Sequence, residues 1–399
     1  MKDDSYKKEI IDPGDKASKL AKEVCTESYG NCLALDIFQP RAGFREAVTW
    51  LWKEPILQSM IRQKVRETVE NDGAGGKPQF FTLLGIESAF LNLGWEIIEM
   101  AAEDIARRGG FPALMVNEIN AKRITEKNYH LFEAMMRGYG EALRRARLAN
   151  ITGEIAIMKH SITAFCDDGT DEQLILTWGG TCIGLSAPEL FIDSSQIRPD
   201  MVVVGFEEPG YRCNGGTFFT NLILHYYGKT PAEIWQHPEA LKFIRDLAVP
   251  SLNYSRTITR LVGWEEDGSV SEPLVKIHGA AHITGGGVWG KFGEILPPGV
   301  GAYLDNMPPP AAVLLKAQKM SFDTPHHLTD KNAYGTLHGG CGMLLVVEER
   351  DVPIVIGEAE KDGIRAQKVG KTTKDSGSTI FIRSRFYDEG RMLSPLMKN

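Results

Sequence analysis

The sequence has no general excess of positive charge: 45 Lys and Arg residues stand against 52 Asp and Glu residues, giving a formal net charge of −7. Such a chain has no general electrostatic attraction for a phosphate backbone or an anionic membrane surface. Binding to nucleic acid is therefore not expected. Local basic side chains and backbone amides can still bind a small anion.

Long apolar runs are also missing. The first residues, MKDDSYKKEIIDPGDK, contain no apolar stretch of a secretion signal. The least polar later segment, residues 174–188, is short and rich in Gly and Thr. We therefore expect no membrane span, no membrane partner and a cytoplasmic location.

The cysteines do not form a zinc or redox motif. Six are present, but none belongs to a C-x-x-C pair. We expect reduced thiols in a reducing compartment. Cys213 has no activating base nearby in the sequence, so we expect it to be packed rather than nucleophilic.

What the chain does have is length and a mixture of patterns. Its 399 residues, 43% of them hydrophobic, are enough for two or three domains. Apolar periodicity predicts helices over residues 94–108, 126–149 and 231–247. Short apolar runs predict strands over residues 113–116, 173–177, 201–205, 302–305 and 343–347. The pattern indicates an α/β (α+β) protein.

The segment DSSQIRPD, residues 193–200, is polar and resembles a linker. We place a domain boundary there, which gives domains at 1–197 and 198–399. A separate apolar and aromatic stretch lies between residues 30 and 70, and its helical spacing predicts a core or interface helix.

The most distinctive local motif is HITGGG at residues 282–287, in which three glycines stand directly before a short helical run. Glycine lets the backbone approach a ligand closely, and amides at a helix start can point at an anion. His282 and Thr284 add side-chain donors. The motif predicts a phosphate-binding loop, with a plain turn as the alternative.

A second glycine-rich segment, NDGAGGK at residues 71–77, combines a carboxylate with a lysine. It does not fit a Walker A loop, because Asn71 and Pro78 occupy positions that require Gly and Ser or Thr. Asp72 could hold Mg²⁺ and Lys77 a phosphate, although a solvated turn would look the same.

Read in order, these segments resemble the AIR synthetase family. The matching stretches are SYKKEIID at 5–12, DGAGGK at 72–77, ED at 103–104, GEIAIM at 153–158, CNG at 213–215, PSLNY at 250–254, HITGGG at 282–287 and GGCGM at 339–343. The resemblance implies two α/β domains, with the N-terminal domains of two subunits forming a shared β-barrel and ATP bound beside it. A homodimer is therefore expected.

The activity that the resemblance implies is the ATP-dependent cyclisation of formylglycinamidine ribonucleotide to aminoimidazole ribonucleotide in purine biosynthesis. ATP would phosphorylate the formyl amide oxygen, and the amidine nitrogen would then close the ring. Two alternatives remain: another ATP-using enzyme of the same superfamily, or a non-catalytic relative that binds nucleotide.

The resemblance also implies roles for individual residues. Catalytic roles fall to Asp72, Lys77, Asn214 and His282, and ATP with Mg²⁺ falls to Lys7, Asp72, Gly73, Gly75, Lys77, Asp104 and Glu154. Of these, Asp72, Asp104 and Glu154 are the expected metal ligands. The expected substrate and phosphate contacts are Asn214, Gly215, Thr284, Gly285, Gly286 and Gly287.

The sequence departs from the family pattern mainly in its first half. Residues 62–71 are charged where the family has an apolar strand, and Gly76 replaces the family's Thr. Arg212 and His338 stand where the family has His and Asn. These departures concern the ATP site most directly.

Overall fold

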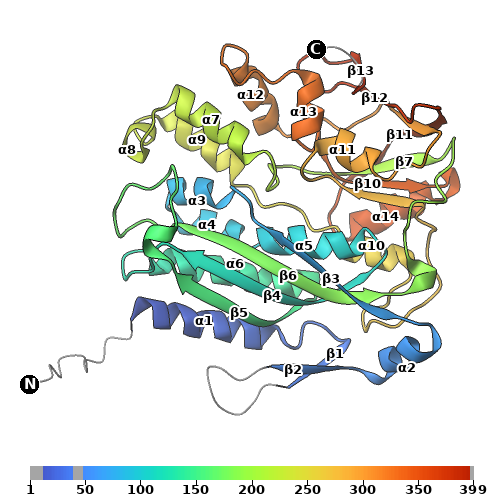
Figure 1. The fold of residues 1–399 in the computed structure, drawn as a ribbon, viewed down its shortest axis with the longest axis horizontal. Coiled ribbons are helices and arrows are strands. Elements are labelled where there is room, and N and C mark those ends of the chain that lie inside the picture. Colours follow the sequence, from blue (N-terminus) through green and yellow to red (C-terminus); the bar gives the residue numbers. More distant parts are fainter. Residues whose placement is uncertain (1–11, 39–47, 396–399) are drawn as a thin grey trace, which may run out of the picture.

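Two large β-sheets, each with its own helices, make up most of the described molecule, beside a small two-stranded sheet (Figure 1). The computed structural model describes residues 12–38 and 48–395. The first sheet has the strand order β3-β6-β4-β5. Its strands are β3 (Arg66–Gly73), β4 (Phe111–Ala121), β5 (Ala149–Ile157) and β6 (Leu176–Ser186). Only β4 and β5 pair in parallel.

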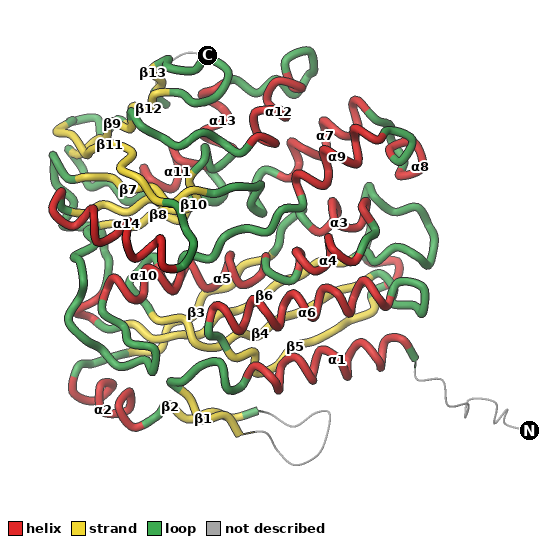
Figure 2. Tube along the Cα trace, turned by 180° about the vertical axis from the view of Figure 1, so that it is seen from behind, coloured by secondary structure: helices red, strands yellow, loops and turns green. Residues whose placement is uncertain are grey.

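Helices cover one face of this first sheet and leave the other face open (Figures 1 and 2). On the covered face, Met115, Trp178 and Cys182 are buried among residues of the helices. The helices in this half are α1 (Pro13–Ser28), α3 (Pro78–Leu84), α4 (Glu87–Leu93), α5 (Glu96–Ala106) and α6 (Tyr129–Ala146). The open face carries Val69, which is 60% exposed.

The second sheet has seven strands in the order β13-β12-β9-β11-β7-β10-β8. These strands are β7 (Val202–Glu207), β8 (Gly279–His282), β9 (Val300–Leu304), β10 (Cys341–Val347), β11 (Ala366–Lys374), β12 (Ile380–Arg383) and β13 (Met392–Leu393). Successive side chains of β7 enter different cores: Val203 one, and Val202 and Val204 another. This alternation means that the central strand β7 is buried on both faces of the sheet.

The remaining helices pack on the two faces of this sheet. They are α7 (Gly216–Tyr226), α8 (Pro231–Ile234), α9 (Pro238–Leu247), α10 (Ser255–Val262), α11 (Gly287–Gly293), α12 (Ala312–Ser321), α13 (Asp330–Thr336) and α14 (Val352–Lys361). Apolar residues of α7, α9, α11 and α12 share one core with the sheet. Those of α10 and α14 share the other core, which also includes Phe111 and Leu185 of the first sheet. The two halves are therefore joined by a common apolar core.

Most of the expected elements are confirmed, with shifted ends. The helices expected at 94–108 and 126–149 are α5 and α6, and the strands expected at 113–116, 201–205, 302–305 and 343–347 lie in β4, β7, β9 and β10. The prediction of a single helix at 231–247 is wrong, because this segment forms two helices, α8 and α9. Pro238 begins α9, and a proline is accommodated in the first turn of a helix but not in its interior.

The expected domain boundary falls between the last strand of the first sheet, which ends at Ser186, and β7. The segment 193–200 is not a free linker, since Ile197 is buried in the core. In the 30–70 stretch, a hairpin of β1 (Leu35–Phe38) and β2 (Thr49–Trp52) precedes α2 (Glu54–Arg62). Residues 39–47 lie outside the described part.

Two expectations from the sequence concern the membrane span and the cysteines, and both can be compared with the described residues. None of the helices described here combines the length and apolar character that crossing a bilayer requires. All six cysteines are free and buried. Burial raises the pKa of the Cys213 thiol well above its ordinary value, and its Sγ lies 3.3 Å from Oε2 of Glu96. This thiol is therefore protonated and packed, as expected.

Candidate functional site

Four loops that are far apart in the sequence meet between the two sheets. Gly75 packs so closely on the residue 212–216 loop that a Cβ there would lie 2.7 Å from the Cys213 carbonyl oxygen. A Cβ on Gly287 would lie 2.2 Å from the carbonyl oxygen of Tyr334, near the 337–343 segment. The structure thus brings together the NDGAGGK, RCNGG, HITGGG and LHGGCGM motifs.

The glycines at these loops are needed for close approach and for backbone conformation. Gly215 and Gly286 have φ angles of 86° and 92°, which side chains of L-residues rarely adopt. They precede α7 and α11 directly. The loops therefore present backbone next to one another with little side-chain bulk between them.

Asn214 lies where two of these loops meet. A Cβ on Gly285 would be 3.4 Å from its Oδ1. Its Nδ2 is buried and has no hydrogen-bond partner among the described residues. A buried amide without a partner is costly, so an unfilled donor here is a strong indication of a ligand contact.

Asp72 and Asp104 form an acidic mouth beside these loops. Burial raises the pKa of Asp72, the Gly73 N–H that it accepts at 2.7 Å lowers it, and the negative charge of Asp104 raises it again. Lys291 of α11 is close enough to lower it. Two carboxylates and a lysine therefore share one electrostatic environment.

The second acid of this mouth is held firmly in its ionised form. Burial raises the pKa of Asp104, but hydrogen bonds from His282 and Arg107 outweigh it and lower the pKa to about 2. The Arg107 Nε lies 2.7 Å from Asp104 Oδ1, and His282 Nδ1 lies 3.1 Å from the same oxygen. A fixed carboxylate of this kind suits a divalent cation.

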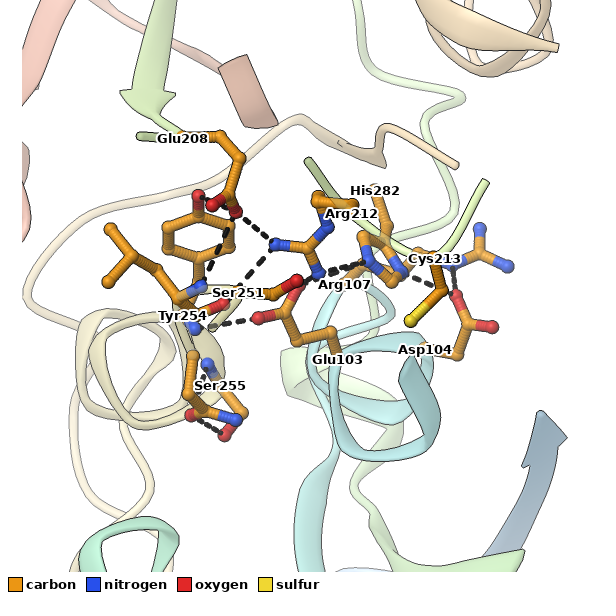
Figure 3. Close-up of polar contacts among 12 residues, drawn as sticks. Glu103, Asp104, Arg107, Glu208, Arg212, Cys213, Ser251, Tyr254, Ser255 and His282 are labelled. Carbon is orange, nitrogen blue, oxygen red and sulfur yellow. Dashed lines mark hydrogen bonds and ion pairs between the residues drawn. The ribbon is translucent and has the colours of Figure 1, made fainter. Parts of the chain in front are cut away.

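His282 links this mouth to a buried ionic cluster (Figure 3). Its Nε2 lies 3.0 Å from Nη2 of Arg212 and 3.1 Å from Oε2 of Glu103. Burial lowers the pKa of His282 to about 4, so the ring is neutral at pH 7. A neutral ring that donates from Nδ1 to Asp104 can accept at Nε2 from Arg212.

Arg212 occupies the centre of that cluster with almost no exposure. Its guanidinium contacts Oε2 of Glu103 at 3.1 Å and Oε2 of Glu208 at 2.6 Å. Burial alone would lower the pKa of Arg212, but these two carboxylates raise it well above its ordinary value. Tyr254 completes the cluster, since its N–H donates to Glu103 and its hydroxyl to Glu208.

The structure does not bring Lys77 to the surface of the site. Its Nζ donates to Oε1 of Glu96 at 2.8 Å and to the carbonyl oxygens of Tyr211 and Val249. The side chain is 0% exposed, as is that of Glu96. In this arrangement the ammonium joins the two halves of the molecule and faces away from the loops' outer surface.

Glu99 lies buried between the Lys77–Glu96 and Arg212–Glu103 ion pairs. Glu96, Glu99 and Glu103 follow one another along α5, and all three are fully buried. Neither carboxyl oxygen of Glu99 has a hydrogen bond among the described residues. Burial, and then the charge of Glu103, raises the pKa of Glu99 well above its ordinary value, so it is protonated at neutral pH.

The protonated carboxyl group of Glu99 makes the free energy of unfolding depend on pH in a way that can be tested. Unfolded Glu99 would titrate near pH ~4.3, whereas the folded protein keeps the proton, so the free energy of unfolding falls as pH rises above that value. We expect Glu99→Gln to remove up to about 1.4 kcal/mol per pH unit from this slope between pH 5 and 8. Urea unfolding at a series of pH values measures it. Exposed Glu118→Gln is the control, and an unchanged slope in Glu99→Gln would contradict the assignment.

Two expected site residues are not part of this gathering. Lys7 lies outside the described residues. Glu154 is exposed on β5, at the far edge of the first sheet from β3, and pairs with Glu118 of β4. Among the described residues, no three acidic, His or Cys side chains form a ready-made metal site. Mg²⁺ bound with a nucleotide needs only one or two carboxylates in addition to phosphate oxygens.

Sequence reasoning missed several residues of the site. Lys291 follows the three glycines directly in GGGVWGK, and its position one turn into α11 could have indicated it. Glu96, Glu99 and Glu103 stand at i, i+3 and i+7 on the apolar side of a helix. Acids at core spacing are a recognisable signal, because unpaired carboxylates are very rarely buried.

Comparison with known proteins gives the same picture. Residues 59–185 match the N-terminal domain, and residues 269–383 the C-terminal domain, of AIR synthase related proteins. A phosphoribosylformylglycinamidine cyclo-ligase of Oceanobacillus iheyensis is 26% identical over 84% of this chain and 86% of its own length. One of Methanocaldococcus jannaschii is 24% identical over 76% of this chain and 77% of its own.

Solved structures share the fold at much lower sequence identity. Thiamine-monophosphate kinase from Stenotrophomonas maltophilia has a TM-score of 0.54 at 13% identity, over 93% of this chain and 96% of that one. Hydrogenase maturation protein HypE in complex with ATP has a TM-score of 0.53 at 13% identity, over 84% and 85%. Since the two domain matches together span more than half of the sequence, the chain belongs to the AIR synthase related family.

Proposed function

We propose that the protein is an ATP-dependent cyclo-ligase that converts formylglycinamidine ribonucleotide to aminoimidazole ribonucleotide. The observation that carries this proposal is the meeting of the four glycine-rich loops beside Asp72, Asp104 and the unpartnered amide of Asn214. The curated relatives named as cyclo-ligases support the choice of reaction within the family.

Asp72 and Asp104 are the residues that fit Mg²⁺ with ATP. Their carboxylates lie within electrostatic range of each other, and His282 and Arg107 hold Asp104 ionised. Lys291 would neutralise phosphate charge in the place that the sequence suggested for Lys77. When bound, ATP supplies the phosphoryl group that turns the formyl amide oxygen into a leaving group. Gly73 and Gly75 would let the backbone approach the nucleotide.

Asn214 and the HITGGG loop fit the substrate and its phosphate. The Nδ2 of Asn214 has no partner among the described residues, and a Cβ on Gly285 would lie 3.4 Å from its Oδ1. Gly215, Thr284 and residues 285–287 would supply the other substrate contacts. These groups would orient the amidine nitrogen toward the formyl carbon, and the amide oxygen would leave with phosphate. Positioning of this kind contributes most of the rate in phosphoryl transfer.

His282 would position rather than transfer protons in this scheme. Its neutral ring donates to Asp104 and accepts from Arg212, so both nitrogens are already engaged. A ring held in this way keeps the Asp104 carboxylate pointing at the mouth of the site.

The open face of the first sheet supports a homodimer. Val69 is exposed there, and an uncovered four-stranded sheet is a surface on which a second copy can pack. Glu154 lies on this sheet's outer strand, so any role for it at the nucleotide would depend on the partner copy.

ADP release with Mg²⁺-ATP, with and without formylglycinamidine ribonucleotide, tests the proposal. We expect the substrate to stimulate turnover and Asp72→Asn to lower it by roughly a hundredfold or more, as loss of a charge-stabilising group does. Asp323→Asn, at an exposed acid away from the site and from the open sheet face, serves as the control. ATP binding without stimulation by this substrate would move the function to another ATP-using enzyme or to a nucleotide-binding relative.

A further inference from the structure

A second cavity, of about 260 Å³, lies where the end of α6 meets α10 and the turn that follows α10. It is separate from the four loops. Its main walls are Phe111, Pro112, Arg147, Arg256, Arg260 and Trp264. Three guanidinium groups and an aromatic wall in one small cavity are an uncommon combination, because like charges repel when they are gathered.

The three arginines are not equally well neutralised. Arg260 is held by Oε2 of Glu358 at 2.6 Å and Oδ2 of Asp362 at 2.8 Å. Arg147 and Arg256 instead share the single carboxylate of Glu266, which Arg256 contacts at 3.6 Å. Asp362 lies within electrostatic range of both cations but forms no direct ion pair with either of them in the described part of the chain.

That shared carboxylate is a weak partner. The Glu266 side chain is 58% exposed, and exposed ion pairs contribute little to stability because water and salt screen them. Burial, followed by the charges of Arg256 and Arg260, lowers the pKa of Arg147 below its ordinary value. Among the acids of the described residues, only this exposed carboxylate therefore contacts Arg147 and Arg256 directly.

The backbone conformation of Arg147 also bears on this cavity. This residue ends α6 with a φ of 57°, in the left-handed region that residues other than glycine seldom adopt. The conformation ends the helix, because the Arg147 N–H donates to the carbonyl oxygen of Arg144. Here it places the guanidinium in the cavity beside Arg256.

We propose that this cavity binds a phosphorylated small molecule, with Arg147 and Arg256 on the phosphate in place of Glu266. Guanidinium groups pair with phosphate oxygens through charge-assisted, bidentate hydrogen bonds, which are stronger than the exposed ion pair they replace. Pro112 and Trp264 would contact the organic part. The volume suits a molecule of sugar-phosphate size and exceeds what phosphate alone needs.

Calorimetric titration of the full chain with glucose 6-phosphate, beside inorganic phosphate, tests this proposal. We expect Arg256→Gln to weaken binding about tenfold or more, as loss of a charged hydrogen bond does. Glu266→Gln frees both guanidinium groups and should tighten binding about threefold. In binding free energy this is about half of the tenfold change expected for Arg256→Gln. Glu265→Gln, which removes the neighbouring exposed charge without freeing an arginine, should change affinity less than Glu266→Gln.

Asn214→Ala, at the four-loop site, distinguishes that site from the cavity, because it should leave glucose 6-phosphate affinity unchanged. Loss of binding in that variant, or no gain in Glu266→Gln, overturns the proposal. If inorganic phosphate binds as tightly as the ester with the same response to Arg256→Gln, the organic part contributes nothing and the sugar-phosphate proposal is wrong. None of these results depends on cyclo-ligase activity.

Discussion

Replacing Arg212 with Met should destabilise the protein by about 3–5 kcal/mol, the loss that follows when one member of a buried ion pair is removed. The guanidinium is the common partner of Glu103 and Glu208, and all three side chains are nearly or fully buried. Without it, two carboxyl groups face each other in a dry interior. Chemical unfolding of the variant measures the loss.

Arg107→Met is the matched control for this experiment. Arg107 also bonds a carboxylate, at 2.7 Å from Asp104, but that pair is 22% exposed on both sides. An exposed pair of this kind contributes about 0–1 kcal/mol. If Arg212→Met lost no more stability than Arg107→Met, the cluster around Arg212 would not stabilise the contact between the two halves of the molecule.

The glycine-rich motifs that carry the family resemblance belong to loops that lie close together in the structure. Each motif combines glycine with a polar residue, and the close backbone contacts at Gly75 and Gly287 leave no room for a Cβ. The sequence could not show which way each side chain points. The Nζ of Lys77 finds carbonyl partners 134 and 172 residues away, and no local pattern encodes contacts at that distance.

Strand β3 shows where the prediction of secondary structure from the sequence fails. Its sequence, RETVENDG, has no apolar alternation, so it was not recognised as a strand. It forms because all eight residues pair with β6, while Val69 and Asn71 lie on the open face of the sheet. A strand with one solvated face can be read from the sequence only when its other face is clearly apolar. The helix broken at Pro238 could have been predicted from the proline itself.

Lys77→Met separates a structural role from a nucleotide-binding role. We expect a loss of about 3–5 kcal/mol in stability, because Glu96 and the carbonyl oxygens of Tyr211 and Val249 would lose their common donor. We expect the folded variant to bind ATP with nearly unchanged affinity, since the Lys77 ammonium that it lacks is enclosed in the unchanged protein. Nucleotide titration at a temperature well below the unfolding transition measures this affinity.

Lys291→Met should give the opposite result. Its ion pair with Glu294 is long, at 3.6 Å, and Glu294 is 63% exposed, so we expect little loss of stability. Because Lys291 lies within electrostatic range of Asp72, we expect ATP affinity to fall about tenfold, the effect of one charge-assisted hydrogen bond. If Lys77→Met lost ATP affinity at unchanged stability, while Lys291→Met did not, Lys77 would be the phosphate ligand. The buried arrangement of its ammonium would then have to open when nucleotide binds.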